Sequence, residues 1–307
     1  MKEGAAADQA VQEASRRTTS RRELARHEFF EEVSPEVGEL DEDAFDSKLE
    51  EDPDAALAML ADLTGATDPK LRELARRLAG RIVVELARRG TPTRRGIGRI
   101  ARQKYRPDGG DIDLDASVET VVIARATGTL PDIDELRITG WSRPGTGLCL
   151  LVDRSGSMTG LPLATAALAA AAVACRAPDD YSVVAFAADA IVAKSQESPK
   201  SSEHVVNAIL TLRGFGTTDV VLALRTAADQ LGRSRAARKV AVLLSDCRST
   251  VPGDVAAMAR FLDELVIVAP AGDSAEAEAL ARDVGARFVT VGGPSEIAAA
   301  LNEALSS

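Results

Sequence analysis

Two apolar runs that each lead to an aspartate limit the folds this chain can adopt. Leu148–Val152 is unbroken and is followed by Asp153, and Val240–Leu244 is followed by a serine and then Asp246. A short run without polar alternation is typical of a strand buried on both faces of a parallel sheet. Because ligands of open α/β sheets bind at the carboxyl ends of the strands, both aspartates are predicted to lie at that edge.

Hydroxyl groups accompany these carboxylates in the sequence. Ser155 and Ser157 follow Asp153 at alternate positions, and Gly214–Asp219 reads Gly-Phe-Gly-Thr-Thr-Asp at the start of a predicted helix. Such hard oxygen ligands suit Mg2+ or Mn2+ and not zinc. Each aspartate alone could be an ordinary strand-end residue, and the serines could cap a helix. These explanations do not account for the occurrence of all these residues together.

The conjunction resembles the von Willebrand factor A domain over roughly residues 145–307. In that family the matching residues form a metal-ion-dependent adhesion site, so the resemblance implies Mg2+ or Mn2+ bound at Asp153, Ser155, Ser157, Thr218 and Asp246. Two positions depart from the pattern. Cys247 stands where the family often has glycine, and Gly216-Thr217-Thr218 replaces Gly-Gly-Thr, so Thr217 rivals Thr218 as the ligand. Thr218 is preferred because the following Asp219 and the helix register match.

Alternating strand and helix patterns after residue 147 predict a doubly wound, mostly parallel six-stranded sheet of the von Willebrand factor A or Rossmann-like class. Strands are expected near 148–153, 181–187, 190–194, 238–245, 264–269 and 287–291. Helices are expected near 160–176, 201–212, 218–232, 253–262, 274–284 and 294–305. Only two residues separate the second and third strands, which predicts an antiparallel hairpin.

The first half of the chain is predicted to be mostly helical. Polar residues 1–22 read as a disordered tail, and residues 23–108 as a helical domain with helices starting at Asp52-Pro53 and Asp68-Pro69. Residues 109–146 form a connecting segment with a helix near 117–126 and a strand near 136–141. Residues 147–307 form the α/β domain. The segment from Gly109 looks like the one preceding the A domain in bacterial CoxE-like proteins and relatives of the magnesium chelatase D subunit.

Net charge and the number of cysteines limit the binding partners and the cell compartment that we expect for this chain. The net charge of −10 argues against nucleic acid and anionic membranes. Residues 23–54 hold 14 acidic and two basic side chains, whereas residues 70–106 hold 13 basic and two acidic ones. These segments either face each other and solvent, or the basic one docks an acidic partner or nucleic acid. Three scattered cysteines and the lack of an apolar leader favour the cytoplasm, and no run is long enough to span a membrane.

The resemblance implies a binding module that works beside a MoxR-type AAA+ ATPase in metal insertion or protein maturation. An ion held by neutral hydroxyls keeps an electrophilic open position, which suits an acidic side chain of a protein partner. One alternative is a subunit of a magnesium or cobalt chelatase, although no phosphate-binding G-x-x-x-x-G-K-[ST] loop is present. The other is a phosphotransfer enzyme with Asp153 as nucleophile, but Ser155 stands where a second acid is needed. We therefore expect no catalytic residues. Arg154 either contacts the incoming acid or is solvated.

Overall fold

A computed structural model describes residues 1–90, 99–104, 111–128, 136–142, 145–154, 159–212, 214 and 216–306. The chain divides into two compact units. Met1–Pro92 and Thr146–Ser307 form the first, and Thr93–Gly145 forms the second.

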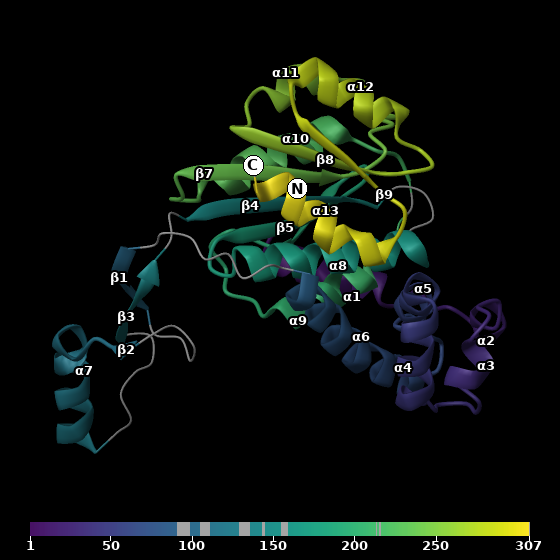
Figure 1. Cartoon of the computed structure of the whole chain (residues 1–307), viewed down its shortest axis with the longest axis horizontal. Coiled ribbons are helices and arrows are strands. Elements are labelled where there is room, and N and C mark those ends of the chain that lie inside the picture. The colour runs from purple at the N-terminus through teal and green to yellow at the C-terminus, as the bar shows by residue number, and fades with distance from the viewer. Residues whose placement is uncertain are drawn as a thin grey trace. The chain divides into compact units, whose positions relative to one another are not determined.

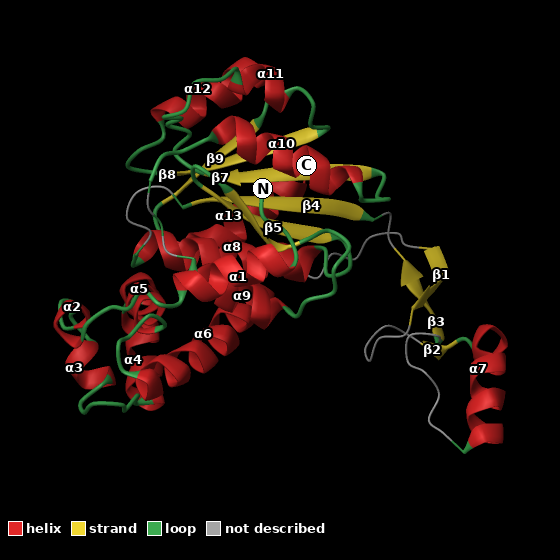
Figure 2. Cartoon of the chain, turned by 180° about the vertical axis from the view of Figure 1, so that it is seen from behind, coloured by secondary structure: helices red, strands yellow, loops and turns green. Residues whose placement is uncertain are grey.

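The first unit is built on a six-stranded sheet with the order β6-β5-β4-β7-β8-β9 (Figure 2). All neighbouring strands are parallel except β5 and β6, which form the predicted antiparallel hairpin. The fold class predicted from the sequence is therefore confirmed. The strands are β4 (Thr146–Asp153), β5 (Tyr181–Phe186), β6 (Ala190–Lys194), β7 (Arg238–Leu244), β8 (Glu264–Pro270) and β9 (Arg287–Val291).

Helices cover both faces of this sheet, which explains why the strands are continuously apolar. Leu148, Leu150 and Val152 of β4 face one apolar cluster, and Cys149 and Leu151 face the other. The first cluster includes side chains of α8 (Leu161–Arg176), α9 (Ser202–Thr211) and α13 (Pro294–Ser306). The second includes α10 (Val220–Gly232), α11 (Val255–Ala259) and α12 (Ala275–Val284). Among the described residues, no helix is both long and apolar enough to cross a bilayer.

The predicted separation of a helical domain from the α/β domain differs from the structure. The N-terminal helices α2 (Arg21–Leu24), α3 (Phe30–Val33), α4 (Glu42–Glu51), α5 (Pro53–Leu63) and α6 (Pro69–Gly90) share one apolar cluster with α8 and the sheet. The reason is that α8 is buried at nearly every position from Leu163 to Ala174, so the sheet covers one side and α5 and α6 cover another. We call residues 20–90 the helical region (Figure 1).

The predicted disordered tail over residues 1–22 is also wrong. Residues Ala5–Ala14 form α1, and Ala7 and Ala10 are buried. Before this helix, the Lys2 N–H donates to the Ala190 carbonyl at 2.7 Å, and the Lys2 carbonyl accepts from the Val192 N–H at 2.9 Å. The prediction rested on the average polarity of the segment. It therefore overlooked the two small buried alanines and the extended Lys2, which pairs with the edge of β6.

The second unit contains an antiparallel sheet with the order β1-β3-β2 and one helix. Its strands are β1 (Arg99–Lys104), β2 (Asp111–Ile112) and β3 (Arg137–Ser142), and its helix is α7 (Leu114–Thr127). The Asp113 carboxylate caps α7 by accepting from the Ala116 N–H at 3.0 Å, so the helix begins three residues before the predicted start. This segment, predicted as a connection, is thus a small folded unit between α6 and β4 in sequence.

Candidate functional site

The two aspartates predicted from the apolar runs lie at one edge of the sheet. Val152 pairs with Leu244 across β4 and β7, so Asp153 and Ser245 continue side by side and Asp246 follows. The Ser245 hydroxyl donates to Asp153 Oδ2 at 2.6 Å. Ser245 is buried, whereas Asp153 and Asp246 are partly exposed. The strand register therefore brings both carboxylates to a solvent-accessible edge.

Ser245 is a site residue that sequence reasoning missed. Besides donating to Asp153, its hydroxyl oxygen accepts from the Cys247 N–H at 2.9 Å. One buried hydroxyl thus joins the end of β4 to the turn that carries Asp246. Its role depends on the register of β4 and β7, which pairs Val152 with Leu244 and is not written in either strand alone.

The turn after β7 contains an unusual backbone conformation. Cys247 has φ +62°, and no other residue apart from glycine has a positive φ in the described part of the chain. Glycine adopts this left-handed region without the clash that a Cβ causes. The departure noted in the sequence, cysteine where the family often has glycine, therefore falls on a position where glycine is physically favoured. The Asp246 carboxylate supports the turn by accepting from the Arg248 N–H at 3.0 Å.

Thr218 lies on a segment that is tied to the same turn. Its N–H donates to Thr250 Oγ1 at 2.8 Å, and its carbonyl accepts from the Thr250 N–H at 3.0 Å. Thr218 is buried, and its rival Thr217 is exposed. Asp219 caps α10 by accepting from the Leu222 N–H at 2.8 Å, as the predicted helix start requires. These contacts bring the Thr218 segment to the Asp246 turn.

The other two predicted ligands, Ser155 and Ser157, lie outside the described residues. The neighbouring Arg154 is described, and it is neither solvated nor positioned as an isolated cation. It is buried and forms an ion pair with Asp189, which also pairs with the Lys2 ammonium at 2.9 Å. Burial acts to raise the pKa of Asp189, but the hydrogen bond from Lys2 and the charge of Arg154 outweigh it and leave that pKa lowered.

The electrostatics of this edge fit a divalent cation. Burial first, and then the negative charges of Asp246 and Asp153, raise the pKa of the Cys247 thiol to about 12. Both carboxylates therefore act on one small region, where a cation would be stabilised. The described residues contain no group of three or more His, Cys, Asp or Glu side chains arranged around a metal. The predicted site instead combines two carboxylates with hydroxyls, which is a donor set for Mg2+ or Mn2+.

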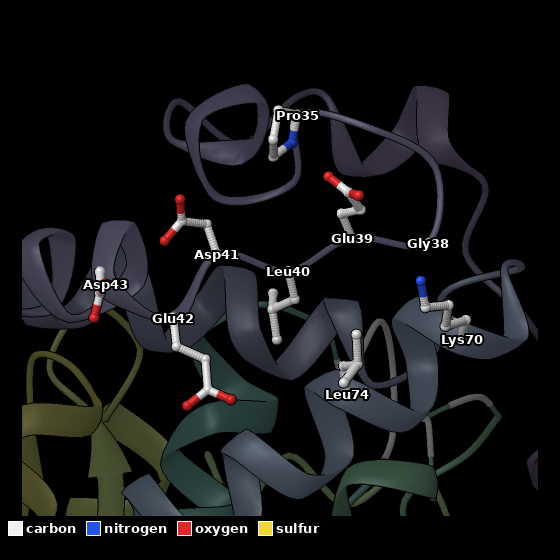
Figure 3. A pocket seen from close by; sticks show the side chains of 9 residues that line it. All are labelled: Pro35, Gly38, Glu39, Leu40, Asp41, Glu42, Asp43, Lys70 and Leu74. Carbon is white, nitrogen blue, oxygen red and sulfur yellow. The ribbon is translucent and has the colours of Figure 1, made fainter.

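A hollow lined by several acidic side chains lies elsewhere, on the helical region. The hollow has a volume of about 500 Å3. Figure 3 shows its acidic side chains around two leucines. Glu42 at its rim pairs with Arg81 of α6 at 2.5 Å, so the acidic and basic segments do face each other at this point. The lining residues are Pro35, Gly38, Glu39, Leu40, Asp41, Glu42, Asp43, Lys70 and Leu74.

Comparisons with solved structures find similar chains at low identity. An aerotolerance-related membrane protein from Bacteroides fragilis, carrying multiple mutations to serine, is 14% identical, with 53% of this chain and 99% of that chain covered and a TM-score of 0.41. A von Willebrand factor type A protein from Catenulispora acidiphila is 21% identical, with 54% and 43% covered and a TM-score of 0.43. The domain of a type V pilus tip protein from Porphyromonas gingivalis is 19% identical, with 34% and 38% covered and a TM-score of 0.31.

No curated protein sequence matches this chain. A family model does, and its match spans residues 148–249. The matched range runs from the start of the apolar part of β4 through Asp153, Thr218 and Asp246 to the turn after β7. Residues 148–249, which lie in the α/β part of this chain, therefore match the family of von Willebrand factor type A domains.

Proposed function

We propose that this chain is a metal-dependent protein-binding module whose site lies at the carboxyl edge of β4 and β7. The observation that carries the proposal is the pair of carboxylates at adjacent strand ends, where the Ser245 hydroxyl joins Asp153 to the turn that carries Asp246. Domains of the matched type commonly mediate metal-dependent protein interactions. No catalytic step is part of the proposal, and the two histidines, His27 and His204, belong to the helical region and to α9.

The residues that would hold Mg2+ or Mn2+ are Asp153, Thr218 and Asp246, together with Ser155 and Ser157. A bound ion among these largely neutral donors supplies a position that favours an anionic oxygen. Protein carboxylates are the available anionic oxygens, so the partner is expected to contribute one Glu or Asp. The resemblance to CoxE-like proteins points to a MoxR-type AAA+ ATPase as this partner. The unpaired state of Cys149, Cys175 and Cys247 supports a cytoplasmic location for the pair.

Isothermal titration with Mn2+ tests the metal site. We expect the wild type to bind and Asp153→Ala to lose binding, because that variant removes one of the two carboxylates. Glu276→Gln is the control, since Glu276 is an exposed acid that contacts Arg248 of the same turn but lies outside the motif. Equal Mn2+ binding by the wild type and Asp153→Ala would refute the assignment.

Co-purification tests the partner. Wild type and Ser155→Ala/Ser157→Ala are immobilised, and a purified MoxR-type ATPase is added with Mg2+ or with EDTA. We expect retention only by the wild type in Mg2+. Retention under all conditions would show that the ATPase docks somewhere other than the metal site.

A further inference from the structure

Helix α5 of the helical region carries two carboxylates that reach the α/β domain. Asp62 Oδ1 accepts from the Gly160 N–H at 3.0 Å, and Asp54 Oδ1 accepts from the Ser295 N–H at 2.8 Å. Gly160 precedes α8, which follows β4, and Ser295 lies in the first turn of α13, which follows β9. Both helices begin at the carboxyl edge of the sheet, so α5 lies along the edge that holds the candidate site (Figure 1).

Gly160 is the residue at which the chain enters α8, three positions after Ser157. Its backbone, with φ +59° and ψ −126°, is in a region that only glycine adopts readily. No side chain at this position caps α8. Asp62 supplies a carboxylate there from a distant part of the chain, and a negative charge at a helix N-terminus is favourable.

Asp62 is itself held firmly. Only 9% of the residue is exposed, and its second carboxylate oxygen lies 3.0 Å from His27 Nε2. The helix around it is buried at every position from Ala56 to Leu63. A carboxylate this deeply buried costs free energy unless it is hydrogen-bonded, so the contacts to Gly160 and His27 are needed to keep it there.

We propose that Asp62 is a positioning residue of the metal site, an inference that rests on the function proposed above. Asp153 is fixed at one end of the motif by Ser245, and Gly160 is fixed at the other end by Asp62. Holding Asp153 and Gly160 in place before the ion arrives lowers the conformational entropy that binding costs. The helical region thereby takes part in metal binding through one hydrogen bond, without supplying a ligand.

The test compares Asp62→Ala with Asp54→Ala in the full chain. Each variant removes a carboxylate of α5 that accepts from a backbone N–H near a helix start, but only Asp62 does so next to the motif. Mn2+ titration should show about a tenfold loss of affinity for Asp62→Ala, the size typical of residues that support metal ligands. Asp54→Ala should bind like the wild type. Asp62→Asn, which keeps an oxygen acceptor, should recover most of the affinity.

Hydrogen exchange without metal gives a second readout. The Gly160 amide should exchange faster in Asp62→Ala than in Asp54→Ala, because only the first variant removes its acceptor. If Asp62→Ala does not fold, Asp62→Ser takes its place in both measurements, because the shorter serine side chain cannot reach the Gly160 N–H. Equal Mn2+ affinity in the Asp62 variants, Asp54→Ala and the wild type would overturn the inference while leaving the metal site intact. A wild type that binds no Mn2+ would instead overturn the proposed function, and this inference with it.

Discussion

At position 247 we expect the glycine variant of the protein to be more stable than the alanine variant, which is the reverse of the usual order. A left-handed backbone costs a residue with a Cβ roughly 1–2 kcal/mol, and Cys247 has φ +62°. Cys247→Gly removes this cost, and Cys247→Ala keeps it. Both variants lose the thiol, so their difference isolates the backbone term from the chemistry of the sulfur.

Two effects oppose glycine at this position. Its greater freedom in the unfolded chain costs roughly 0.4–1 kcal/mol relative to alanine. The half-buried alanine methyl group contributes about 0.4 kcal/mol, half the value of a fully buried methylene. The relief of strain favours glycine by more than these two effects favour alanine. Cys247→Gly should therefore be more stable than Cys247→Ala by about 0.5 kcal/mol. Without the strain, alanine would be ahead by about 1 kcal/mol.

Urea unfolding followed by circular dichroism measures this difference. Cys175 provides the comparison, because it is also partly buried but lies in the right-handed last turn of α8. There, alanine should exceed glycine by up to about 1 kcal/mol, the difference found in helix interiors. If alanine also exceeds glycine by that amount at position 247, the left-handed conformation is not the state of this turn in solution, and our explanation of the cysteine is wrong.

Three further predictions concern acid stability, catalysis and domain independence. Hydrogen bonds from Arg238, together with the charge of Arg287, outweigh the effect of burial and lower the pKa of Glu264. The ionised Glu264 therefore stabilises the fold fully above its unfolded pKa, and this stabilisation is lost as the pH falls through the folded pKa. The difference in urea midpoint between wild type and Glu264→Gln should therefore be larger at pH 6 than at pH 3.5, and an equal difference at both would contradict the assignment. The purified chain should not hydrolyse ATP, and phosphate release that co-elutes with the protein and disappears in Asp153→Ala would favour phosphotransfer instead. A fragment of residues 146–306 should unfold at lower urea than the full chain, because α8 loses its contacts with α5 and α6; an equal midpoint would show that the helical region does not stabilise the sheet.

The sheet and its edge could be predicted because their signals are local. The unbroken run before Asp153 indicates a doubly buried strand, and Ala188-Asp189 between two strands indicates a hairpin. Asp52-Pro53 marks the start of α5 for an equally local reason, since the carboxylate caps the helix and proline fits its first turn. Each of these depends on neighbouring residues alone.

The docking of the helical region could not be predicted in the same way. Asp62 follows an apolar stretch and resembles any polar residue near a helix end, and nothing nearby indicates that Gly160 is its partner. Arg154 and Asp189 are 35 positions apart, so their ion pair depends on how β5 and β6 align with β4. Ligand identity at Thr218, and the roles of Ser155 and Ser157, stay predictions.

The pairing of Lys2 with β6 has a practical consequence for handling the protein. β6 is one of the two outer strands of the sheet, and an uncovered outer strand is a template on which another chain can add. Lys2 occupies that edge at Ala190 and Val192 and places its ammonium on Asp189, the partner of Arg154 beside Asp153. Proteolytic loss of the first three residues during purification would uncover this edge and remove the Lys2 ammonium from Asp189.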